Sequence, residues 1–252
     1  MPSKILPGGR AVEAVPGEPL KLGEKLSFYT ADSSYHGGTG GGDARREFAC
    51  GQYFDGRWEN DEQEGHGSLK TKDGNSYEGE WSGGNMHGQG TYTWSSGSSY
   101  SGQWEGGIKH GEGTLTLYSG NVYTGQWRNG KRHGWGTLTV AKPTIGSVAR
   151  YEGEWVDDAR TGKGTTINYD GHVELSRYEN GQRVGEGLRV LDPARKKPFD
   201  ETFPGPFRLM DGKEVEMVDL PTAEGIAKSL GLAMPEVAYA VDEEADAKKK
   251  KK

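Results

Sequence analysis

The sequence predicts an all-β protein, in which stacked β-hairpins form an elongated, single-layer, twisted antiparallel sheet that ends in a small C-terminal hairpin-helix cap. Two observations carry this prediction. The 252 residues include 42 Gly, 12 Tyr and 7 Trp, but only 32% are hydrophobic, which is too little for a thick two-layer core. The aromatic and glycine positions also recur every 23 residues, and such a period indicates a repeat array in which each unit packs on its neighbours.

Six successive units share the phrase Y-x-G-x-W, in which an opening residue is followed four positions later by an aromatic ring. The units are residues 54–76, 77–99, 100–122, 123–150, 151–173 and 174–190. They open at Phe54, Tyr77, Tyr100, Tyr123, Tyr151 and Glu174, and the fourth following position holds Trp58, Trp81, Trp104, Trp127, Trp155 and Tyr178. The interval from Tyr123 to Tyr151 is 28 residues, so we expect about five extra residues to form a loop between Val140 and Arg150.

Each unit is predicted to be one β-hairpin. Alternate residues of a strand share a face, so Tyr, Gly and Trp of each phrase lie on one side of the sheet and the polar residues on the other. The glycine is expected to leave a slot for a ring from the adjacent hairpin. Residues 136–140 alternate β-branched and aliphatic side chains, which predicts a return strand, and Asn129-Gly130 predicts the hairpin turn. Six hairpins give about twelve strands.

Three units resemble MORN repeats closely. The segments YEGEWSGGNMHGQGTYTWSSG, YSGQWEGGIKHGEGTLTLYSG and YTGQWRNGKRHGWGTLTV follow the pattern of that family: YxGxW, a short turn, HGxG and a return strand. The resemblance covers residues 54–190, with close copies over 77–140 and degenerate units on both sides. Atypical end units are expected in a stack whose ends face solvent.

The flanks are predicted to differ from the array. Residues 1–53 are rich in Gly and Pro and are expected to be a flexible N-terminal segment, with a degenerate seventh repeat as the alternative. Residues 191–235 are expected to form a C-terminal cap on the last repeat that shields the open sheet edge: a hairpin around Asp211-Gly212, then a short helix with Asp219 as its N-cap and Gly231 at its end. Residues 236–252, acidic and then Lys-rich, are expected to be disordered.

The repeated rings have two interpretations that do not exclude each other. In the first, each hairpin simply packs its rings on the next. In the second, a one-layer sheet leaves its large aromatic side chains partly open, so that they line a groove for an amphipathic helix or an extended peptide. The residues predicted to form this protein-binding groove are Tyr77, Trp81, Tyr100, Trp104, Tyr123, Trp127, Tyr151 and Trp155.

No catalytic residue, metal site or cofactor is predicted. His87, His110 and His133 recur at the period, but copies two strands apart lie about 10 Å from one another and cannot share one zinc ion, so turn positions are expected for them. Acid pairs such as Glu78 with Glu80 are expected on a solvated face. The net charge of −6 disfavours nucleic acid and predicts weak or no phospholipid binding. The unit 123–150 is basic, and Arg128, Lys131 and Arg132 are its candidate anion contacts.

The resemblance therefore implies a non-catalytic scaffold that docks a protein partner on the aromatic face. Short members of the family that consist only of repeats often serve in cilia and flagella or in other cytoskeletal assemblies, so we expect an intracellular protein of the cytoskeleton, with a cilium or flagellum axoneme as its place and an axonemal or cytoskeletal protein as its partner. A homodimer is a further expectation. The alternative is a peripheral membrane tether for anionic phospholipids. Family members with enzymatic activity carry a separate catalytic domain, for which about 60 residues after Arg189 leave no room.

Overall fold

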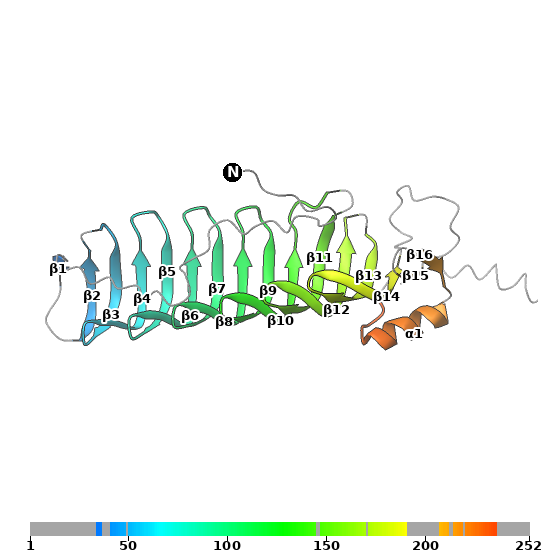
Figure 1. The fold of residues 1–252 in the computed structure, drawn as a ribbon. Helices are drawn as coiled ribbons and strands as arrows, with labels where there is room; N and C mark the ends of the chain where they lie inside the picture. The colour runs from blue at the N-terminus through cyan, green and yellow to red at the C-terminus, as the bar shows by residue number, and fades with distance from the viewer. Residues whose placement is uncertain are drawn as a thin grey trace, which may run out of the picture.

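The computed structural model describes residues 34–36, 41–48, 50–144, 147–169, 171–190, 207–211, 214–218 and 220–235. Within these residues, sixteen strands form one antiparallel sheet in chain order, followed by a single helix, which confirms the predicted all-β fold (Figure 1). The twelve strands β3 to β14 make the predicted array of six hairpins.

The elements follow the sequence without a crossover. They are β1 Ser34–His36, β2 Gly42–Glu47, β3 Tyr53–Glu59, β4 Glu62–Lys70, β5 Ser76–Ser82, β6 Asn85–Thr93, β7 Ser99–Glu105, β8 Ile108–Thr116, β9 Val122–Arg128, β10 Lys131–Thr139, β11 Val148–Val156, β12 Ala159–Asn168, β13 Val173–Glu179, β14 Gln182–Val190, β15 Phe207–Asp211, β16 Glu214–Met217 and α1 Leu220–Leu230. The five-residue insertion lengthens the connection between β10 and β11 and leaves the pairing of these strands intact, as expected.

Tight turns with left-handed backbone join the two strands of each unit. Asn129 and Gly130 have φ of 51° and 79°, which is the geometry of the hairpin turn that the Asn-Gly pair predicts. In the fifth unit, Asp157 and Asp158 adopt the same region, with φ of 48° and 71°. Aspartate tolerates this conformation better than most residues, which explains why a turn forms here without glycine.

Every repeat hairpin bends near its middle, so the sheet has two legs (Figure 1). In the second unit, residues 76–79 and 90–93 form the upper leg, and residues 80–87 form the lower leg. The pairing register shifts between Gly79 and Glu80, because Gly88 and Gln89 form a bulge in the partner strand. Gly88 has φ of 52°, a value that favours glycine, and the corresponding glycines of the other repeats share it.

Paired glycines, such as Gly102 and Gly113, lie where the two legs meet, a line that we call the crease. The absence of side chains there leaves room for the opening ring of the same hairpin. A Cβ atom added to Gly113 would lie 2.6 Å from Cε2 of Tyr100, and one added to Gly79 would lie 2.6 Å from the hydroxyl of Tyr77. The prediction that the slot receives a ring from the adjacent hairpin is therefore wrong. The opening tyrosine leans along its own strand into the slot, where its hydroxyl donates a hydrogen bond to a carbonyl three residues ahead: Tyr100 Oη lies 3.0 Å from the oxygen of Gln103. Phe54 lies in the same slot of the first unit without a hydroxyl.

The rings form a continuous edge-to-face ladder along the array. Each opening ring contacts the tryptophan of its own unit and that of the next, with centroids 5.0–5.5 Å apart and planes 82–90° apart, and Tyr178 ends the series. Each tryptophan Nε1 also donates to a carbonyl of the preceding unit, as Trp127 does to Gly113 at 3.1 Å. The face that carries this ladder is called the inner face below, and the opposite one the outer face.

Burial makes the opening tyrosines sensitive to alkaline pH. Loss of hydration raises the pKa of Tyr77, Tyr100, Tyr123 and Tyr151 above its ordinary value of about 10. Above pH 10 the unfolded chain loses these protons while the folded chain keeps them, so stability falls by up to about 1.4 kcal/mol per pH unit for each tyrosine. Below about pH 9 the four groups contribute no pH dependence.

We therefore expect the tyrosinate absorbance of these four residues to rise together with the loss of strand circular dichroism in an alkaline titration. Substitution of Tyr100 and Tyr123 by Phe should make the alkaline unfolding less steep. Ionisation of all twelve tyrosines while the strand signal stays unchanged would contradict the buried ladder.

The N-terminal flank departs from the expected flexible segment at residues 42–47. These residues form β2, which pairs with β3, and residues 34–36 add β1 at the edge. Trp58 Nε1 donates to the oxygen of Ala44 at 3.0 Å, so Ala44 stands where the later units have a crease glycine. Arg46 lies 3.9 Å over the Trp58 ring and pairs with Asp61 at 2.6 Å. Residues 1–33, 37–40 and 49 lie outside the described residues.

The C-terminal strands and helix extend the array and cover one part of it. Strand β15 pairs with the upper leg of β14, and β16 becomes the edge. Helix α1 packs its Ala223, Ala227 and Leu230 on Leu175 and Leu188. Leu175 occupies the outer-face position that Thr124 holds in β9, so the helix packs on the one repeat whose outer face is apolar. The predicted N-cap Asp219, the turn residue Gly212 and the tail 236–252 lie outside the described residues.

The helix ends as predicted, at Gly231. This glycine has φ of 66°, its amide donates to Lys228 O at 3.0 Å, and the amide of Leu232 donates to Ala227 O at 3.0 Å. This pair of bonds is the Schellman arrangement that glycine favours after a helix.

Candidate protein-docking surface

The residues predicted to line the groove form the core of the array instead. Tyr77, Tyr100 and Tyr151 are 0% exposed, and the most exposed of the eight, Trp127, is only 4% exposed. The prediction assumed that a single layer could not cover both edges of each ring. The bend removes that limit, because it folds the upper and lower legs over the ladder and each ring covers the next. A partner cannot reach these side chains directly.

The lower leg covers the rings with one residue from each preceding hairpin. This residue stands nine positions after the opener and faces the tryptophan, or Tyr178, of the next unit. Lys109 Nζ lies 4.3 Å from the centroid of Trp127, Arg132 Cζ lies 4.3 Å from that of Trp155, and Arg160 Cζ lies 6.0 Å from that of Tyr178. Such cation–π contacts contribute about 0.5–2 kcal/mol each. This position is held in the six units by Gln63, Met86, Lys109, Arg132, Arg160 and Arg183, which we call the cover row. The cation–π contacts to the next unit are those of Lys109, Arg132 and Arg160.

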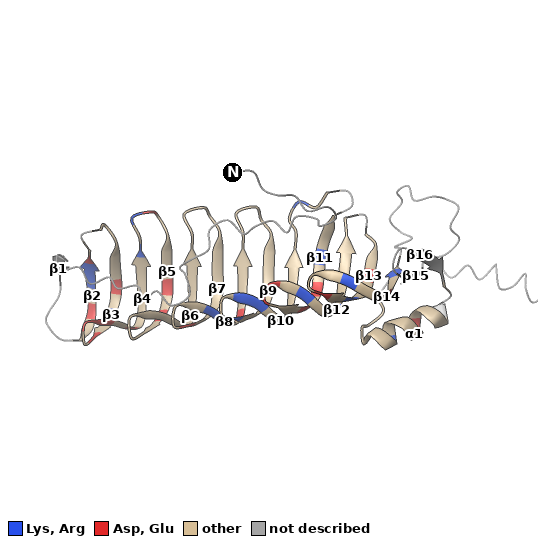
Figure 2. Ribbon diagram, viewed as in Figure 1, with Lys and Arg blue, Asp and Glu red and all other residues tan. Residues whose placement is uncertain are grey.

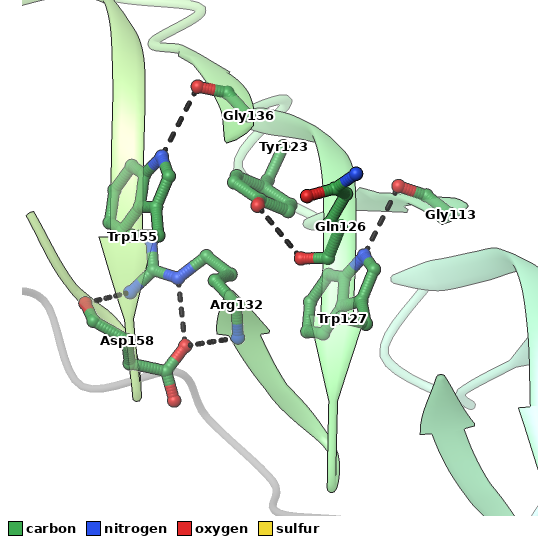
Figure 3. Close-up of polar contacts among 8 residues, drawn as sticks. All are labelled: Gly113, Tyr123, Gln126, Trp127, Arg132, Gly136, Trp155 and Asp158. Atoms are coloured by element: carbon green, nitrogen blue, oxygen red, sulfur yellow. Dashed lines mark hydrogen bonds and ion pairs between the residues drawn. The ribbon is translucent and has the colours of Figure 1, made fainter. Parts of the chain in front are cut away.

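Arg132 is held in place by the adjacent turn (Figure 3). Its Nε donates to Asp158 Oδ1 at 2.8 Å, its Nη2 donates to the Asp158 carbonyl at 3.1 Å, and the Arg132 amide also donates to Oδ1 at 3.1 Å. Its side chain is 14% exposed. Arg132 is predicted as an anion contact together with its neighbours, but its guanidinium lies over the Trp155 ring and is already paired with Asp158. Arg128 and Lys131 are exposed and flank the turn at Asn129, and their role as anion contacts stays a prediction.

An apolar strip runs beside the rings on the upper leg of the inner face. Tyr92 and Leu115 are buried at 8% and 7% exposure, and Tyr92 contacts Trp104. Trp94, Leu117 and Leu138 pack against the same core but remain partly open to solvent. These three residues, which we call the inner strip, are the accessible apolar groups that the analysis of the sequence missed. The alternation of the return strands, which predicts a strand, also marks these apolar positions.

The outer face is polar over the central repeats. Thr91 bonds to Ser101 at 3.0 Å, and Thr114 lies 3.1 Å from Thr124. Acidic and amide side chains on this face also accept hydrogen bonds from backbone amides in the bulge. Gln89 N donates to Glu80 Oε1 at 2.8 Å, a role that the prediction of a solvated face did not include. The same contact recurs in three later units, through Gln103, Gln126 and Glu154.

The recurring histidines stand in strands and not in turns, which corrects the prediction. His87 and His110 lie in β6 and β8 directly before the bulge glycine, and the carbonyl of His110 accepts from Tyr100 Oη at 3.4 Å. Both line a shallow depression of about 300 Å³ together with Glu80, Gln103 and Glu105. Within the part of the chain that the structure describes, no cluster of three or more His, Cys, Asp or Glu side chains is arranged to hold a metal ion.

The described part of the chain contains no helix that is long and apolar enough to span a membrane.

Comparison with protein families identifies the repeats. The model of the MORN repeat matches five consecutive segments of the chain, residues 54–76, 77–99, 100–122, 123–139 and 151–173. Their boundaries agree with the first five units that the period predicts, apart from the insertion after Thr139. No curated protein matches the chain. MORN repeats are non-catalytic modules that generally mediate interactions with proteins or membranes.

Proposed function

This chain is a MORN-repeat protein, and on that premise we propose that it is a non-catalytic scaffold that docks a protein partner on the inner face of its bent sheet. The observation that carries the proposal is the inner strip. Trp94 and Leu117 stand at the same position of two successive repeats, and Leu138 stands two positions earlier in the next repeat. All three are partly exposed and lie beside the buried ladder. Aromatic and aliphatic side chains that stay partly open next to a rigid core are typical anchors of protein interfaces.

The outer face offers fewer contacts of this kind. Its central hydroxyl rows are polar, and Trp135 and Val156, which are exposed apolar groups, form one small diagonal pair on the neighbouring strands β10 and β11. A strip that spans several repeats is a better platform than one small pair of exposed side chains, which is common on protein surfaces.

A peripheral membrane tether remains the second candidate, and the observation that favours it is the exposed pair Arg128 and Lys131 at the tip of the fourth lower leg. At about 1 kcal/mol per cation near an anionic surface, two residues supply a weak contact.

A place in an axoneme or another cytoskeletal assembly, and the formation of a homodimer, are parts of the proposal that rest on the family resemblance alone. Imaging of the tagged protein and measurement of its mass in solution test them.

We expect the change of Trp94 and Leu117 to Ala to weaken partner binding by about 10-fold or more, since each removes an anchor of about 1 kcal/mol or more. The measurement is quantitative recovery of crosslinked partners from the native cell by the tagged variant and by the parent protein. The matched control is Trp135→Ala, which removes a 40% exposed tryptophan from the outer face.

Circular dichroism and the unfolding midpoint establish that each variant is folded. If recovery falls with Trp135→Ala and not with the inner-strip variant, the docking face is the outer one and the proposal is wrong. Flotation with anionic vesicles that is lost on changing Arg128 and Lys131 to Glu would support the tether instead.

A further inference from the structure

The inner strip begins in an uncharged part of the sheet. Residues 88–104 and 113–127, which include the upper legs of β6 to β9, contain no charged side chain, and Figure 2 shows these upper legs in tan. Trp94 and Leu117 stand in this region, partly open to solvent and packed against the buried ladder. Trp94 also contacts the Tyr92 ring, with the centroids 4.9 Å apart. A surface of this kind favours an apolar segment of low charge.

The spacing of Trp94 and Leu117 suits a polyproline II segment. The two side chains stand at the same position of successive repeats, two strands or about 10 Å apart. Polyproline II rises about 9.3 Å in a turn of three residues, so its residues i and i+3 reach both positions from one face. In a β-strand, three residues span a similar distance, but residues i and i+3 point to opposite faces. Proline-rich segments of this kind bind to surfaces lined with aromatic side chains.

The chain itself carries a segment with this pattern. Pro16 and Pro19 lie at i and i+3 within residues 15–20, whose sequence is VPGEPL. Each proline fixes φ near the polyproline II value, and the two prolines with Gly17 between them disfavour a helix. Val15 and Leu20 flank the prolines and add apolar surface.

The connection between this segment and the sheet has a suitable length. From Pro19 the chain continues for about 15 residues to Ser34, the first residue of β1 at the edge of the sheet. The strip begins beside β6, which is five strand spacings or about 24 Å from β1. A flexible chain of about 15 residues has an r.m.s. end-to-end distance of about 21 Å. Because effective concentration is highest when these two lengths match, the segment reaches the strip at an effective concentration on the order of millimolar.

Other parts of the chain outside the described residues fall short of Trp94 and Leu117. The C-terminal tail begins after Leu232 and Met234, which pack with α1 on the outer face over β13 and β14. Its apolar part, residues 236–241, extends at most about 20 Å, whereas β8 lies about 24 Å from β13 and Leu117 faces the other side. Residues 191–206 leave β14 and return to β15. Half of that length, about 26 Å at full extension, is less than the distance of about 29 Å to β8.

We propose that residues 15–20 bind the inner strip of their own chain as a polyproline II segment, with Pro19 against Trp94 and Pro16 against Leu117, and that a protein partner must displace them. This autoinhibitory contact rests on the proposed docking function and adds its regulation. A contact whose dissociation constant is about a tenth of the effective concentration lowers the affinity for the partner about 10-fold.

The test places benzoylphenylalanine at position 117 of the full chain, and the purified protein is irradiated without a partner. Trypsin cleaves after Arg10 and Lys21, so residues 11–21 form one peptide. Mass spectrometry should find this peptide joined to the peptide that contains position 117, with a yield that does not depend on protein concentration. The same probe at position 124 on the outer face should give no such product.

Two triple variants show whether the contact depends on the proline segment. The variant in residues 15–20 should lower the intramolecular yield at least 5-fold and raise the recovery of crosslinked partners from the native cell at least 3-fold. The matched control changes two prolines and a leucine outside the segment and should leave both quantities unchanged. Circular dichroism checks that the array is folded in each. The variants are Pro16→Ser with Pro19→Ser and Leu20→Ser, and Pro2→Ser with Leu6→Ser and Pro7→Ser.

The outcomes separate this contact from the docking function. If position 117 crosslinks a partner in the cell but never residues 11–21 in the purified protein, the docking face stands and the autoinhibitory contact is wrong. Crosslinks from position 117 to residues 236–252, or to a second chain with a yield that rises with concentration, overturn the contact as well. A yield that the change of Pro16, Pro19 and Leu20 leaves intact contradicts the proline recognition. If position 117 crosslinks neither its own chain nor a partner, the contact and the docking face are both wrong.

Discussion

Replacement of Trp127 by alanine is expected to lower the free energy of unfolding by about 3–5 kcal/mol. The indole is 4% exposed and contacts two rings of the ladder, Tyr100 at 5.2 Å and Tyr123 at 5.1 Å. The substitution also removes the hydrogen bond to Gly113 and the contact with Lys109. Denaturant unfolding followed by circular dichroism measures the loss. Because neighbouring repeats stabilise one another, we expect the effect to spread beyond the fourth unit.

The same hairpin contains its own control. Trp135 is 40% exposed on the outer face, so Trp135→Ala is expected to lower stability by only about 1 kcal/mol, clearly less than Trp127→Ala. If Trp127→Ala and Trp135→Ala lowered the free energy of unfolding equally, the assignment of Trp127 to a buried inner-face ladder would be wrong.

The second large effect is expected from Gly113→Ala. The new methyl group would lie 2.6 Å from Cε2 of Tyr100, in a crease where that ring is 0% exposed. Since the ring packs between two tryptophans, it cannot move away without disturbing both contacts. Overpacking of this kind costs about 1–3 kcal/mol and occasionally more. The thermal midpoint and denaturant unfolding of the variant measure the cost.

Gly225→Ala is the matched substitution with the opposite expected sign. Gly225 lies within α1, and a Cβ atom there meets nothing within 4 Å. Alanine favours a helix by about 0.5–1 kcal/mol over glycine, so this variant should be as stable as the parent or more stable. If both glycine substitutions proved harmless, the close approach of Tyr100 to the crease would be incorrect.

The sequence was sufficient for the array and for the direction of its side chains. The 23-residue spacing predicts the hairpins, and the alternation in Tyr77, Gly79 and Trp81 places all three on one face because strand geometry has a period of two. Local turn chemistry likewise predicts Asn129-Gly130. These features depend on residues close in the chain, so a single sequence reveals them.

The bend and its consequences could not be predicted in the same way. The bulge at Gly88, and the corresponding bulge in each other repeat, bends the hairpin toward the inner face. The opening rings therefore belong to the core and do not line a groove. Contacts between units then decide the remaining roles. Arg132 covers Trp155 and pairs with Asp158, residues that are 23 and 26 positions away, and the pattern of its own hairpin does not reveal these contacts.

The inner face as the docking surface is tested most directly by site-specific photocrosslinking. A benzoylphenylalanine residue replaces either Leu117 of the inner strip or Thr124 on the outer face, and the full chain is irradiated in its native cell. The proposal predicts a discrete crosslinked protein from position 117 and little product from position 124. Equal or greater crosslinking from position 124, or crosslinks from position 117 to lipid alone, would contradict it.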